Sequence, residues 1–192
     1  NDRTLREALA VLAARVNREA SAWPDTSQYI NCKNGMVDIV SGKLYPHHPE
    51  YGSRVQVPVN FNITADARRW YQFLNEIFPD DPGKPRVAGK PDLLQQFIGY
   101  CFYSSCRFEK AMFLFGDGSN GKSTILNILE RMVGREYVST LSIRDLGMRF
   151  KTVFLENKLV NLATETETPD PVGAEILKSA VSGDPLQVEP KY

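Results

Sequence analysis

Residues 111–124 read AMFLFGDGSNGKST, and this stretch decides which fold the chain can adopt. The segment GDGSNGKS at 116–123 fits the phosphate-binding P-loop pattern GxxxxGK[ST]. The apolar run 111–115 precedes it, and such a run is typical of a buried parallel strand. Apolar residues at helical spacing follow over 125–133 and stop at Gly134, which is a typical helix end. A strand, a glycine-rich turn and a helix N-terminus together predict a site for the phosphates of ATP.

Each position of this loop has an expected role. Gly116 and Gly121 allow backbone angles that side chains would forbid, and they let the chain approach the phosphates closely. Lys122 is expected to reach the β- and γ-phosphates, and the Ser123 hydroxyl is expected to bind Mg²⁺. Asp117, Gly118, Ser119, Asn120 and Thr124 complete the predicted ATP-binding set, in which the variable positions shape the loop.

A second candidate segment is acidic. The mostly apolar stretch 159–163 is a strand candidate, and Thr164-Glu165-Thr166-Glu167 follows it. P-loop enzymes need an acidic strand end that holds Mg²⁺ and orients the attacking water. Alternate residues of an extended chain point the same way, so Glu165 and Glu167 would face one side together. We therefore predict Lys122, Glu165 and Glu167 as catalytic residues, with Ser123 and Glu165 serving the metal. The spacing allows this strand to neighbour the strand at 111–115 in a parallel sheet.

Composition sets broader limits. The chain has 192 residues, enough for one domain or two small ones, and its 23 basic and 23 acidic residues balance. A DNA-binding surface would therefore have to be local or assembled from several subunits. The few, irregularly spaced cysteines fit a reducing cytosol, and no apolar run is long enough for a membrane span. Cys32, His47 and His48 could supply zinc ligands, but their spacing matches no usual pattern, and a buried thiol with a His-His turn is favoured.

The rest of the sequence predicts a mixed α/β chain. We expect an amphipathic helix at 3–20, helices at 64–78 and 91–102, and a further helix at 170–183. Residues 29–62 read as irregular β structure, with turns at 33–36 and 41–43 and an alternating stretch at 55–59. Residues 79–90 read as a loop and 186–192 as an extended segment. We place a domain boundary near Ser105. The predicted fold class is α/β, with a partial P-loop NTPase core at 106–192 preceded by a mainly helical α+β domain at 1–105.

Beyond the P-loop, the sequence has a set of ordered segments at 34–38, 41–47, 97–101, 113–123, 159–167, 177–178 and 182–185. Together these segments resemble the helicase portion of phage and plasmid primase–helicases, in helicase superfamily three. The resemblance implies an ATP-driven motor, related to AAA+ ATPases, that assembles as a ring (typically a hexamer) and unwinds single-stranded or forked DNA during replication. It also implies a primase domain in the same polypeptide, a cytoplasmic location in the host cell, and Lys191 as a candidate DNA contact.

One departure from the family pattern limits the expected activity. The family's sensor asparagine and arginine finger would both follow Tyr192, so we expect the sequence to be a piece of a larger protein. Because an arginine finger contributes ~10³–10⁵ in rate, this piece should hydrolyse ATP poorly. Two alternatives stay open: a small-molecule P-loop kinase, and a non-hydrolysing nucleotide-binding or oligomerisation module. For residues 1–105 we expect a non-catalytic collar for oligomerisation or partner docking.

Overall fold

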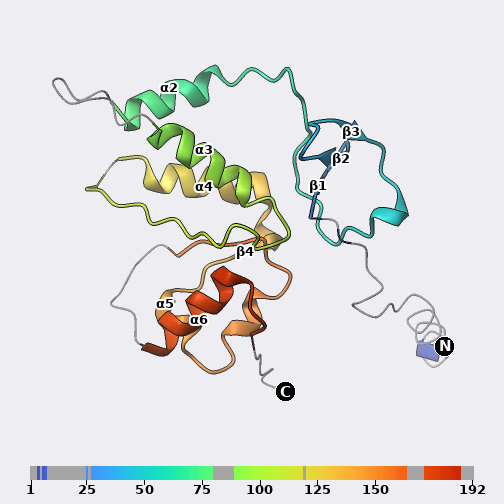
Figure 1. Cartoon of the computed structure of the whole chain (residues 1–192), viewed down its shortest axis with the longest axis vertical. Helices are drawn as coiled ribbons and strands as arrows, with labels where there is room; N and C mark the ends of the chain where they lie inside the picture. Colours follow the sequence, from blue (N-terminus) through green and yellow to red (C-terminus); the bar gives the residue numbers. More distant parts are fainter. Residues whose placement is uncertain are drawn as a thin grey trace.

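Figure 1 shows the computed structural model of the chain. The residues that it describes are 4, 6–7, 25, 27–79, 89–118, 120–163 and 171–186. The helix predicted at 3–20 and the loop predicted at 79–90 lie largely outside the described residues, and so does nearly all of the extended segment at 186–192. Within the described part of the chain, none of the helices combines the length and apolarity needed to cross a bilayer.

The first described unit is a small antiparallel sheet. Its strands are β1 (Tyr29–Cys32), β2 (Gly35–Asp38) and β3 (Leu44–Tyr45), in the order β1-β2-β3. The turns fall where the sequence predicted them, and Gly42 occupies the left-handed region at φ +67°. The alternating stretch around Val57 forms only an isolated bridge to β1 rather than a strand. A small core of Cys32, Val37 and Val57 holds this unit together.

Three helices build the main hydrophobic core. They are α2 (Arg68–Ile77), α3 (Lys90–Tyr100) and α4 (Lys122–Val133), so the helices predicted from apolar spacing are confirmed to within a few residues. The predicted domain boundary near Ser105 stays a prediction. One cluster of buried side chains contains residues from both sides of this position. Its members are Leu74, Leu94, Ile98, Cys101, Ile125, Leu129, Val133 and Val138.

A second, parallel pairing lies beside this core. β4 (Val138–Ser139) pairs with β5 (Val160–Asn161), and between them the chain forms α5 (Ile143–Leu146) and the 3₁₀ turn η4 (Thr152–Leu155). α6 (Pro171–Ser182) packs on α5 (Figure 1). The strand predicted at 159–163 is confirmed in shorter form. Its observed neighbour is β4, a strand too short to leave a periodic signal in the sequence.

The prediction of a buried strand at 111–115 is wrong. No backbone hydrogen bond joins this segment to any strand of the described chain, and the Phe113 and Phe115 side chains are 51% and 86% exposed. Their rings stack with centroids 6.3 Å apart, as expected for side chains on one side of an extended chain. Met112 and Leu114 point the other way and pack on the main core.

The two segments that the sequence predicted to be neighbouring strands share no backbone hydrogen bond in the described structure. A cavity of about 850 Å³ has both 111–115 and 159–163 in its lining, together with residues of α3, α4 and α6. The side chains on one side of the apolar run pack on the helices, while no strand among the described residues pairs with its backbone. The described chain is therefore mixed α/β with small sheets, and a complete P-loop sheet is not formed.

Candidate nucleotide site

The glycine-rich loop has the backbone that its sequence predicts. Gly116 and Gly121 both have positive φ angles, +153° and +85°, and α4 begins directly after Gly121. A Cβ atom at Gly116 would collide with the Asn120 side chain. At Gly121 it would lie 2.7 Å from Cγ2 of Ile77, at the end of α2. Side chains are therefore excluded at both positions, and α2 contacts the loop directly.

Lys122 turns back into the loop. Its Nζ donates to the carbonyl oxygens of Gly116 and Asp117 at 2.5 and 2.8 Å, and to Oδ1 of Asn120 at 2.7 Å. An ammonium group has three N–H donors, so these oxygens use its full capacity. Because each oxygen can be exchanged for a phosphate oxygen, the loop holds a positive group where an anion can bind it.

The start of α4 offers further donors. The first N–H groups of a helix have no partner within the helix, and Gly121 supplies no side-chain cap. The positive end of the helix dipole lies at the same place. Ser123 and Thr124 are exposed on this first turn, and Lys122 and Ser123 also line the 850 Å³ cavity. The hydroxyl groups of Ser123 and Thr124 are thus accessible to a phosphate or to a hydrated cation.

The other predicted site residues cannot be placed. Glu165, Glu167, Ser119 and Lys191 lie outside the described residues, so their roles stay predictions. The strand that leads toward Glu165 is described as far as Ala163, where it lines the cavity that Lys122 also reaches.

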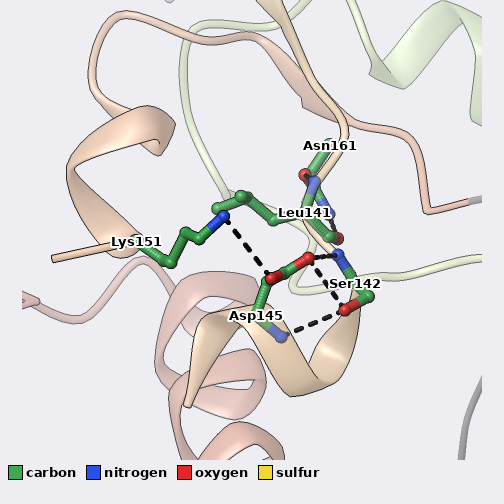
Figure 2. Close-up of polar contacts among 5 residues, drawn as sticks. All are labelled: Leu141, Ser142, Asp145, Lys151 and Asn161. Atoms are coloured by element: carbon green, nitrogen blue, oxygen red, sulfur yellow. Dashed lines mark hydrogen bonds and ion pairs between the residues drawn. The ribbon is translucent and has the colours of Figure 1, made fainter. Parts of the chain in front are cut away.

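A polar cluster beside β5 was not predicted from the sequence. Figure 2 shows Asn161 of β5 joined to the main chain of Leu141, and the neighbouring capping box of α5, in which Ser142 and Asp145 bond each other reciprocally. Hydrogen bonds from the hydroxyl and backbone of Ser142 lower the pKa of Asp145, and Lys151, 3.8 Å away, lowers it further. The Ser142-x-x-Asp145 spacing is the signal that could have revealed this helix start.

The suggested zinc ligands do not form a site in the described chain. His47 contacts the carbonyl oxygen of Cys32 at 2.8 Å and Oδ1 of Asn31 at 3.1 Å, and His48 lies 3.4 Å from Glu50. Burial raises the pKa of the Cys32 thiol, which disfavours the thiolate that zinc needs. Among the described residues, no group of three or more metal-ligating side chains is present.

Comparison with known families gives two matches. Residues 114–192 match a family of unknown function, DUF5906, so this match contains Gly116, Lys122 and both predicted acidic residues but assigns them no activity. Residues 1–79 match the family described as D5 N terminal like. That domain occurs in the primase–helicase proteins of phages and plasmids. The N-terminal region of the chain is thus similar to a part of proteins that replicate phage DNA.

Proposed function

We propose that residues 116–124 bind MgATP and that the chain contributes the ATP-hydrolysing helicase part of a phage or plasmid primase–helicase. The observation that carries the proposal is the Lys122 ammonium held among loop oxygens at the N-terminus of α4. Binding would exchange those oxygens for phosphate oxygens of ATP. The Ser123 hydroxyl and Glu165 would hold Mg²⁺, and Glu165 with Glu167 would orient the attacking water.

The similarity of residues 1–79 to a primase–helicase domain favours DNA over a small molecule as the partner. On this proposal, single-stranded or forked DNA stimulates ATP turnover, Lys191 contacts DNA, and the full protein acts as a hexameric ring. A small-molecule P-loop kinase is the second candidate. A non-hydrolysing nucleotide-binding or oligomerisation module is the third, and the lack of a complete P-loop sheet among the described residues favours it over the kinase.

The test compares two lysine substitutions. Lys122→Ala should abolish binding of a fluorescent ATP analogue with Mg²⁺, because it removes the loop's cation. Lys43→Ala, which changes an exposed lysine just before β3, should leave binding unchanged. ATP turnover is measured for the same substitutions in the full protein, with and without single-stranded DNA, because this piece alone should hydrolyse ATP poorly.

The outcomes separate the candidates. Retained binding in Lys122→Ala shows that the site is wrongly assigned. Binding without turnover, with or without DNA, identifies a non-hydrolysing module. Transfer of the γ-phosphoryl group to a small acceptor identifies a kinase. Turnover stimulated by DNA and lost in Lys122→Ala supports the helicase proposal.

A further inference from the structure

We infer that the Asn120 side chain closes the empty phosphate loop and has to leave Lys122 before a phosphate group can bind. The inference rests on the proposed function, because it concerns the affinity of that same loop for MgATP. In the structure, the Asn120 carboxamide lies between the first glycine of the loop and the lysine at the start of α4.

The Asn120 carboxamide contacts both ends of the loop. Its Oδ1 accepts a hydrogen bond from Nζ of Lys122 at 2.7 Å. Its Nδ2 lies against Gly116, where an added Cβ would collide with it and would lie 3.7 Å from Nζ of Lys122. The carboxamide therefore fills the space between Gly116 and the ammonium group. On the proposed function, a phosphate group has to enter this space to reach Lys122.

Asn120 differs from the other two partners of Lys122 in how it can leave. The carbonyl oxygens of Gly116 and Asp117 belong to the main chain, so they move only when the loop backbone changes. The Asn120 carboxamide can turn away by rotation about its own side-chain bonds while the backbone stays in place. Since an ammonium group has three N–H donors, this departure frees one donor for a phosphate oxygen. Asn120 is therefore the partner that a ligand displaces first.

This contact lowers the affinity of the loop for its ligand. A hydrogen bond to a charged group shifts an equilibrium by roughly tenfold to a hundredfold. Lys122 is half-buried, so water replaces part of the lost contact when the carboxamide turns away, and we expect the lower end of this range. With about one loop in ten open, the apparent dissociation constant is about tenfold higher than that of the open loop.

The test compares Asn120→Ala with Asn127→Ala in the whole chain. The first change removes the carboxamide that contacts Lys122, and the second removes an exposed carboxamide on the second turn of α4. In stopped-flow measurements with a fluorescent ATP analogue and Mg²⁺, Asn120→Ala should bind about tenfold more tightly. The gain should appear in the association rate, with the dissociation rate within about twofold of wild type, because the contact exists only in the empty loop. Asn127→Ala should leave both rates within about twofold of wild type.

Inorganic pyrophosphate tests whether Asn120 acts on the phosphate groups or on the nucleoside. With Mg²⁺, it can displace the fluorescent analogue through its phosphates alone. Asn120→Ala should tighten the binding of pyrophosphate by the same factor as that of the analogue. Where Asn120→Ala does not fold, as judged by circular dichroism, Asn120→Ser serves in its place, since its side chain is shorter and lacks the carboxamide.

Three results would overturn the inference. The first is unchanged or weaker binding by Asn120→Ala, and the second is a gain that comes from slower dissociation. The third is a gain confined to the ATP analogue, with none for pyrophosphate. If wild type and Asn120→Ala both bind neither ligand, the proposed function is overturned as well, whereas a wild type that binds the analogue as tightly as Asn120→Ala overturns this inference alone.

Discussion

Replacing Gly121 by alanine should destabilise the whole protein and not merely alter the loop. Gly121 has φ +85°, and an added Cβ would lie 2.7 Å from Ile77 Cγ2 and 3.2 Å from Phe73 Cζ. Both of these side chains belong to α2 and pack on the main hydrophobic core. The added methyl group therefore has to push α2 away from the loop or distort the start of α4.

The magnitude follows from two separate costs. A non-glycine residue in the left-handed region costs ~1–2 kcal/mol. Forcing a methyl group into a packed contact costs a further ~1–3 kcal/mol. The free energy of unfolding should thus fall by about 2–5 kcal/mol, a large part of the ~5–15 kcal/mol typical of a folded domain. For a chain of this length, that corresponds to a drop in melting temperature of roughly 4–20 °C.

The assay is thermal and urea unfolding followed by far-ultraviolet circular dichroism. Gly118→Ala is the matched control, because it lies in the same loop and a Cβ there meets no atom within 4 Å. It should leave the melting temperature nearly unchanged. In an Ile77→Ala background, the further loss caused by Gly121→Ala should be smaller than in wild type, because the nearest colliding atom is gone.

Two results would refute this reasoning. One is a Gly121→Ala protein as stable as wild type, which would mean that α2 does not contact the loop. The other is an equal loss from Gly118→Ala, which would mean that the loop tolerates no change for reasons unrelated to φ or to α2.

Two further predictions concern titratable side chains. Hydrogen bonds from Ser142 and the nearby Lys151 hold the pKa of Asp145 below its ordinary value. The stabilisation that Asp145 provides is therefore fully present above the ordinary aspartate pKa of ~3.9, and it is lost as the pH falls through the lower pKa of the folded protein. Asp145→Ala should therefore lower the melting temperature at neutral pH, and the difference from wild type should shrink in acid; a difference that is constant with pH would contradict the assignment. Burial raises the pKa of Cys101 to about 12 and also raises that of Cys32, whereas Cys106 is exposed. A thiol reagent at mildly alkaline pH should modify Cys106 quickly and the other two only after denaturation. Cys106→Ser should then remove the fast phase, and a fast phase that persists in this variant would show that a buried thiol is accessible.

The local elements of the fold could be predicted from the sequence because their signals are local. The helices α2, α3, α4 and α6 each carry apolar residues at helical spacing, and Gly134 and Gly183 end two of them with positive φ angles. The hairpin of β1 and β2 follows from its turn residues in the same way. The loop from Gly116 to Lys122 was predicted as well, since its glycines and its lysine need no distant partner to adopt their conformation.

The sequence could not predict which strands pair, because pairing depends on which distant segment of the chain packs beside each strand. Residues 111–115 have the composition of a buried strand, yet packing of Met112 and Leu114 on the helices satisfies only one side of the segment. The strand at 159–163 was expected beside them and instead pairs with β4.

The sequence by itself determined the amphipathic helices, the turns and the glycine-rich loop that holds Lys122. The tertiary structure alone decided that no described strand pairs with 111–115, that α2 contacts Gly121, and that Asn161 joins β5 to Leu141. The physical reason is the distance along the chain over which each kind of interaction acts. Backbone preferences and side-chain spacing act within a few residues, whereas a hydrogen bond across strands requires two distant segments to meet, and only the packed chain brings them together.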